Sequence, residues 1–83
     1  MTANSHLPPT PGLLFRLARV EAGLRQQDLA DAAGCARSRV AQLESAAEVP
    51  EPWCARLVSA IAVLKGDAPD AIVRRIELLA IRP

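Results

Sequence analysis

Residues 26–45 read QQDLADAAGCARSRVAQLES, and this stretch decides how the rest of the chain is interpreted. Small and apolar residues recur at helical spacing on both sides of its glycine: Leu29, Ala30 and Ala33 before it, and Ala36, Val40 and Leu43 after it. Between them, Ala33-Gly34-Cys35 leaves room only for a tight turn. Gly34 stands where a helix often ends on a residue with positive φ. The pattern therefore predicts two short helices, over about 26–33 and 36–46, joined by a turn.

A small residue at the predicted crossing point supports this arrangement. Ala30 lies where two helices joined by so short a turn would approach each other closely. This layout is that of a helix-turn-helix, whose second helix enters the major groove of DNA. With Val40 and Leu43 pointing inward, the opposite arc of the second helix directs four side chains outward: Arg37, Ser38, Ala41 and Gln42.

The stretch and its flanks resemble the Cro/C1-type helix-turn-helix, the domain of small phage and plasmid repressors. The resemblance rests on residues that match the family pattern in register: Arg19, Gly23, Leu24, Gln26, Leu29, Ala30, Gly34, Cys35, Val40, Leu43 and Glu44. It covers residues 13–65, most of the chain. It implies an all-α, five-helix, lambda-repressor-like DNA-binding domain with the helix-turn-helix at its second and third helices. The chain departs from the pattern at Cys35-Ala36, where an aliphatic residue and then Ser or Thr are common.

The outward face of the second motif helix carries the residues that we expect to contact bases. Arg37, Ser38 and Gln42 match positions that contact bases in related repressors. An arginine such as Arg37 can bind O6 and N7 of guanine bidentately, and a glutamine such as Gln42 can bind adenine in the same manner. Ser38 can contact either base. The alternative is that these residues form the solvated polar face of an ordinary helical hairpin.

Three further residues are expected to contact the DNA backbone. Gln26 opens the first motif helix, where a side-chain amide and unpaired backbone N–H groups can meet a phosphate. Gln27 follows it, and Arg39 stands at the flank of the second motif helix. The alternative for Gln26 is a cap on the surface of its helix. The loop after the motif carries Glu48 and Glu51 where related proteins often carry basic residues, which weakens the case for phosphate contacts there.

The resemblance also implies a structural ion pair between Arg19 and Glu44. Arg19 matches the family arginine that pairs with the glutamate of the second motif helix. A partly buried charge needs a partner of opposite sign. We therefore expect this pair to lock the first helix of the chain to the recognition helix.

The composition is that of one small helical domain. A chain of 83 residues forms one domain with a modest core. Apolar residues make up 51 %, the only aromatic residues are Phe15 and Trp53, and no stretch alternates as a strand does. The net charge of +1 is too small for binding nucleic acid mainly through charge, so base contacts should carry more of the affinity.

Cysteine and histidine usage argues against a metal, a cofactor or catalysis. The only His is His6, and Cys35 and Cys54 form no CxxC pair. We expect both thiols in the core as small hydrophobic groups, with a redox switch as the alternative. The sequence has no nucleophile–base pair, carboxylate dyad or phosphate loop, so we predict no enzyme and no cofactor. It has no signal peptide and no transmembrane run, so we expect a cytoplasmic protein without membrane contacts.

The rest of the chain divides into a tail, a domain and a C-terminal helix. We expect a flexible tail over 1–10, the helix-turn-helix domain over 11–66 and a C-terminal helix over 67–83. Thr10-Pro11 favours the start of the first helix and Gly23 its end. The core stripe expected on this first helix is Leu13, Leu14, Leu17 and Val20, widened by Phe15 and Ala18. The core stripe expected on a fourth helix, over 52–65, is Trp53, Leu57, Ile61 and Leu64.

The C-terminal helix carries more apolar surface than so small a domain can bury on one side. Surplus apolar surface of this kind marks an interface. We expect a symmetric homodimer whose interface is formed by Ile72, Ile76, Leu78 and Leu79. The alternative is a fifth core helix without a dimer.

Together these features predict a homodimeric, sequence-specific transcriptional regulator that binds a palindromic operator in double-stranded DNA. Repression would follow from occupying promoter DNA. No sensor domain is expected, so control would come from protein concentration, autoregulation, a co-repressor or another partner protein, and the small size suggests a plasmid or phage origin. The alternative is an antitoxin-like interaction protein that uses the same fold.

Overall fold

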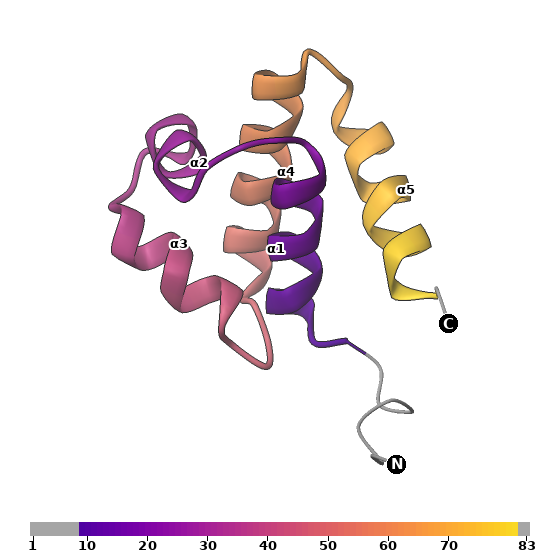
Figure 1. Ribbon diagram of the computed structural model, residues 1–83, viewed down its shortest axis with the longest axis horizontal. Helices are drawn as coiled ribbons and strands as arrows, with labels where there is room; N and C mark the ends of the chain where they lie inside the picture. The colour runs from indigo at the N-terminus through magenta and orange to yellow at the C-terminus, as the bar shows by residue number, and fades with distance from the viewer. Residues whose placement is uncertain (1–8, 82–83) are drawn as a thin grey trace.

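The computed structural model describes residues 9–81, which form five helices and, within that range, no strand. The helices are α1 (Pro11–Glu21), α2 (Gln26–Ala33), α3 (Arg37–Glu44), α4 (Glu51–Lys65) and α5 (Pro69–Ala80) (Figure 1). This confirms the predicted all-α fold with the helix-turn-helix at the second and third helices. Most of the predicted N-terminal tail, residues 1–8, lies outside the described residues, as do residues 82–83.

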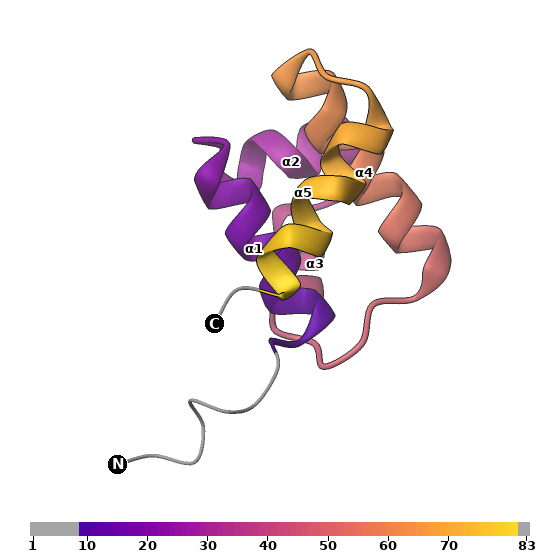
Figure 2. The same ribbon diagram turned by 90° about the vertical axis from the view of Figure 1, so that its right-hand side faces the viewer.

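The helix-turn-helix and α5 lie on opposite sides of the molecule. In Figure 1, α2 and α3 lie to the left and α5 to the right, and Figure 2 shows α5 lying across α1 and α4. The contacts agree with this view, because α2 packs on α3 and α4, α3 packs on α1, and α5 packs on α1 and α4. The outer face of α3 is therefore left uncovered by the other four described helices.

A single apolar cluster holds these helices together. Its largest fully buried side chains come from α2, α3 and α4: Leu29, Val40, Leu57 and Ile61. Ala30 is also fully buried, as expected for a small residue where helices approach closely. Burying an aliphatic side chain of this size contributes about 1.5–3 kcal/mol. The residues that position α3 are thus among the most strongly buried in the chain.

The predicted core stripe of α1 is wrong in its orientation. Leu13, Leu17 and Val20 are 36, 39 and 56 % exposed, while the buried face of α1 consists of Gly12, Phe15, Ala18 and Arg19. Two contacts with α3 turn the helix this way. The Cα of Gly12 lies against backbone carbonyls at the end of α3, and Arg19 reaches Glu44. Leu14 packs against the core, and Phe15 and Ala18, which were expected to widen the stripe, are buried in it.

The predicted start of α1 is confirmed, and the predicted end of α3 is not. The N–H of Leu13 donates to the Oγ1 of Thr10 over 3.2 Å, so Thr10 is the N-cap. Helix α3 ends at Glu44, two residues before the predicted boundary. The N–H of Ala46 donates to the carbonyl of Leu43 over 3.2 Å, which tightens the last turn and stops the helix.

Both cysteines are only half-buried, which corrects the expectation of two fully buried thiols. Each packs at the edge of the core. The Sγ of Cys54 donates to the carbonyl of Val49 over 3.4 Å. Burial, followed by the negative charge of Glu51, raises the pKa of the Cys54 thiol.

Helix α5 is part of the core of the chain. Ile72 and Leu79 are buried, Ile76 is half-buried against the same cluster, and Leu78 is 45 % exposed. Of the four residues predicted for the dimer interface, Leu78 alone presents much of its surface to the outside. None of the helices within residues 9–81 combines the length and the apolar character that crossing a membrane requires.

Candidate nucleic-acid interface

The turn between α2 and α3 is closed by backbone geometry. Gly34 ends α2 in the left-handed conformation, with φ at 72°, and the N–H of Cys35 donates to the carbonyl of Ala30 over 3.0 Å. Glycine adopts this conformation without the steric cost that a side chain brings. Ala36 is the N-cap of α3 and offers no side-chain hydrogen bond. The turn that the sequence predicts at Gly34 is thus confirmed.

Helix α3 has one buried face and one exposed face. Val40, Leu43 and Glu44 are buried, while the four polar residues Arg37, Ser38, Arg39 and Gln42 are exposed. Ala41 is half-buried. The residues expected to contact bases therefore lie on the side of α3 that no other helix covers.

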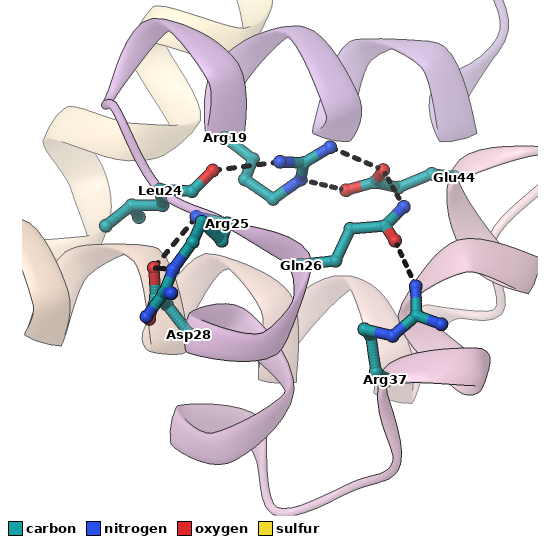
Figure 3. Close-up of polar contacts among 7 residues, drawn as sticks. All are labelled: Arg19, Leu24, Arg25, Gln26, Asp28, Arg37 and Glu44. Atoms are coloured by element: carbon teal, nitrogen blue, oxygen red, sulfur yellow. Dashed lines mark hydrogen bonds and ion pairs between the residues drawn. The ribbon is translucent and has the colours of Figure 1, made fainter.

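Arg19 and Glu44 form a buried ion pair between α1 and α3. The Nε of Arg19 donates to Oε2 of Glu44 over 2.6 Å, and Nη2 donates to Oε1 over 3.0 Å. The third guanidinium nitrogen, Nη1, donates to the carbonyl of Leu24 over 2.8 Å (Figure 3). Parallel hydrogen bonds of this kind combine charge with a fixed orientation. The end of α3 is thereby held against α1.

Gln26 continues this network toward the exposed face of α3. Its Nε2 donates to Oε1 of Glu44 over 3.1 Å, and its Oε1 accepts a hydrogen bond from Nη1 of Arg37 over 3.2 Å (Figure 3). The Gln26 side chain is half-buried, and its two ends bind two different neighbours, Glu44 and Arg37. The sequence leaves two alternatives for Gln26, contact with a phosphate or a cap at the helix surface. Neither alternative includes the two side-chain partners on α3.

Gln27 and Asp28 lie on the outer side of the first turn of α2. The Nε2 of Gln27 donates to Oδ1 of Asp31 over 2.7 Å. The carboxylate of Asp28 accepts hydrogen bonds from the backbone N–H and the guanidinium of Arg25. These hydrogen bonds with Arg25 lower the pKa of Asp28. Gln27 therefore stands beside an acidic side chain, at the same helix start as Gln26.

On the other flank of α3, two arginines lie over the ring of Trp53. The Cζ of Arg39 is 5.6 Å and the Cζ of Arg56 is 4.2 Å from the ring centroid. Arg39 also donates from Nη1 to Oε1 of Gln42 over 3.1 Å. The Nη2 of Arg56 donates to the carbonyls of Ala33 and Gly34 over 2.6 and 3.4 Å.

Arg56 is a member of this cluster that the sequence did not predict. The available signal was its position one turn after Trp53 on the same helix. Its contact with the α2–α3 turn joins positions 22 and 23 residues apart in the sequence, so helical spacing does not reveal it.

An open hollow of about 360 Å³ connects this cluster to the exposed face of α3. Its lining comes from the turn, from α3 and from α4: Gly34, Cys35, Ala36, Ser38, Arg39, Gln42, Trp53 and Arg56. The lining carries two guanidinium groups and no carboxylate. Elsewhere in residues 9–81, no three His, Cys, Asp or Glu side chains gather as a metal site would require.

One comparison with known proteins gives a match, and it agrees with the fold. The chain has no match among curated proteins and none among solved structures. A family model described as a helix-turn-helix domain matches residues 12–71, the region that contains all of α2, α3 and α4. A fold of this kind is typical of DNA-binding regulators. The chain therefore belongs to this helix-turn-helix domain family.

Proposed function

We propose that the chain is a sequence-specific DNA-binding transcriptional regulator that inserts α3 into the major groove. The observation that carries the proposal is the division of α3 into two faces. Val40, Leu43 and Glu44 anchor the helix, and the opposite face carries polar side chains that no other helix covers. The major groove admits an α-helix and presents a different hydrogen-bonding pattern for each base pair.

The bases are contacted by Ser38 and Gln42 at the centre of this face and by Arg37 at its edge. Arg37 binds guanine, Gln42 binds adenine, and Ser38 contacts a neighbouring base. Support for Arg37 comes from its hydrogen bond with Gln26, which restricts a long side chain to one region before DNA arrives. Gln26, Gln27 and Arg39 contact the DNA backbone beside these residues.

The regulator acts as a homodimer on a palindromic operator, and it represses by occupying promoter DNA. Two recognition helices related by two-fold symmetry reach half-sites about 34 Å apart. Two helices offer apolar surface to a second copy. Leu13, Leu17 and Val20 form an exposed apolar row on α1, and Leu78 is exposed on α5. Control comes from protein concentration or from a co-repressor or other partner protein, as in the small repressors of plasmids and phages.

Selection of binding sites from random duplex DNA tests this proposal. We expect a two-fold-symmetric motif for the wild type. In Arg37→Ala, discrimination should relax at one symmetric base pair by about 1–3 kcal/mol. Arg74→Ala, on the exposed surface of α5, removes the same charge and should leave the motif unchanged. Failure of the wild type to enrich any sequence would favour the protein-interaction alternative, which purification with a bound partner protein would support.

A further inference from the structure

Arg56 is held in place without using all of its hydrogen-bond donors. Its guanidinium lies 4.2 Å from the ring centroid of Trp53, and its Nη2 is bound to two carbonyls of the α2–α3 turn. The Nε and Nη1 groups make no hydrogen bond to residues 9–81. Three of the five N–H donors of a guanidinium lie on those two nitrogens. Since Arg56 is exposed, they are available to a ligand.

The position of these donors is defined relative to α3. Arg37 and Arg39 are two residues apart, so they point about 200° apart around the helix axis. Arg37 bonds to Gln26 on α2, whereas Arg39 lies over Trp53 on α4. The exposed face of α3 is therefore flanked by a guanidinium on each side. A helix in the major groove likewise lies between two sugar–phosphate backbones.

We propose that Arg56, Trp53 and Arg39 form a clamp for one phosphate of the DNA backbone, on the flank of α3 away from Arg37. This inference rests on the proposed function and adds Arg56 and Trp53 to the backbone contact that the sequence predicts for Arg39 alone. The Nη1 or Nε group of Arg56 can donate to a phosphate oxygen, and Arg39 brings a second positive charge to the same ring of Trp53. The indole and the two carbonyls hold the guanidinium of Arg56 in place before binding, which reduces the entropy lost on contact.

The clamp also accounts for the charge distribution of the chain. The net charge is only +1, and the loop between α3 and α4 carries Glu48. That loop is therefore poorly suited to meet a phosphate. Arg56, one turn into α4, supplies a positive charge beyond the loop and lines the same hollow as Ser38 and Gln42.

The salt dependence of operator binding tests the clamp. Each phosphate neutralised by the protein contributes about −0.9 to the slope of log K against log salt for B-DNA. Arg56→Gln should therefore make the slope shallower by about 0.9 for each clamp that touches the duplex. Arg74→Gln is the matched control, because it removes one positive charge from α5 and should leave the slope unchanged. A slope that stays at the wild-type value in a folded Arg56→Gln would overturn the clamp and leave Arg56 as a support for the turn.

Fluorescence of the wild type gives a second readout that needs no variant. Trp53 is the only tryptophan, so its emission reports on the clamp. We expect operator DNA to change that emission and inorganic phosphate at equal ionic strength to leave it unchanged. Equal changes with both would mean a site for small anions instead of the DNA backbone. If the wild type selects an operator while emission stays constant, the clamp fails and the proposed function stands; if it selects none, the proposed function fails.

Discussion

Arg19 and Glu44 are bound by two hydrogen bonds of 2.6 and 3.0 Å although they lie 25 positions apart in the sequence. Their side chains are only 10 and 3 % exposed. Taking two charges out of water is costly, and the cost is recovered only when every polar atom is satisfied. Here Leu24 and Gln26 complete the hydrogen bonding. The pair therefore fixes the orientation of α3 relative to α1 and α2.

Replacing Arg19 alone should be far more harmful than replacing the pair. Arg19→Met leaves the carboxylate of Glu44 buried without its cation, and we expect a loss of about 3–5 kcal/mol in the free energy of unfolding. Urea denaturation measures this loss. In the double variant Arg19→Met with Glu44→Leu, no unpaired charge remains, so most of the stability should return. Equal stability of the wild type and the single variant would contradict a structural role for the pair.

The two bonds of Gln26 predict a positioning role that can be separated from phosphate contact. In Gln26→Ala, Arg37 loses its acceptor, so discrimination at the base pair read by Arg37 should relax, beyond the uniform loss of affinity that follows from the lost backbone contact. Site selection measures the discrimination, and binding to a random duplex measures the uniform loss. Gln27→Ala is the neighbouring control and should preserve discrimination. Weaker binding to every sequence with intact discrimination would show that Gln26 acts on phosphate alone and does not position Arg37.

Local patterns sufficed to predict the turn, and long-range contacts explain what they missed. Gly34 predicts the end of α2 because its requirement for positive φ belongs to the backbone itself. The rotation of α1 could not be predicted, because Leu13 and Leu17 form a better apolar stripe than the face built around Gly12. The face around Gly12 is nevertheless the buried one, because it packs against the end of α3, a contact between segments about thirty residues apart. Arg56 was missed for the same reason.

Gly12→Ala should lower the stability of the chain, although the same substitution normally stabilises a helix. Inside a helix, Gly→Ala gains about 0.5–1 kcal/mol. At Gly12, however, an added Cβ would meet the backbone carbonyls of Leu43, Glu44 and Ala46, which cannot rotate away. We expect overpacking to cost about 1–3 kcal/mol, so that Gly12→Ala is destabilised in thermal unfolding.

The matched control for Gly12 is the reverse change at an exposed site. Ala55 lies inside α4 with its side chain exposed, so Ala55→Gly should lose only the helix-propensity difference of about 0.5–1 kcal/mol. A melting temperature for Gly12→Ala at or above that of the wild type would show that the end of α3 can move away from α1.

Cys54 should react slowly with thiol reagents at neutral pH. Burial and the charge of Glu51 raise its pKa above the ordinary value of 9.0, so less thiolate is present than in an exposed cysteine. The measurement is the alkylation rate in a Cys35→Ser background, folded and in urea, and the folded rate should be lower. Because the folded pKa is the higher one, the associated stability is complete below about pH 9 and declines as the pH rises further. Equal rates in the two states would refute the shift.

The dimer surface should include the exposed leucines of α1 and α5. Arg75 of α5 pairs with Glu21 of α1, and Figure 1 shows the two helices running in opposite directions. Leu17 lies one turn before Glu21 and Leu78 one turn after Arg75, so the two leucines fall at neighbouring levels of the helix pair. They are 39 and 45 % exposed, which makes them candidates for contact with a second copy.

Charged substitutions at these two positions should separate the copies without unfolding either one. We expect Leu17→Glu and Leu78→Glu to sediment as monomers and to bind the operator more weakly, because each half-site is then bound independently. Ile72 and Leu79 are unsuitable probes, since a charge there would enter the core of the chain itself. Val63→Glu is the control, because Val63 is 76 % exposed on α4. A dimer that persists in both leucine variants would exclude this surface and direct the search to another face of α5.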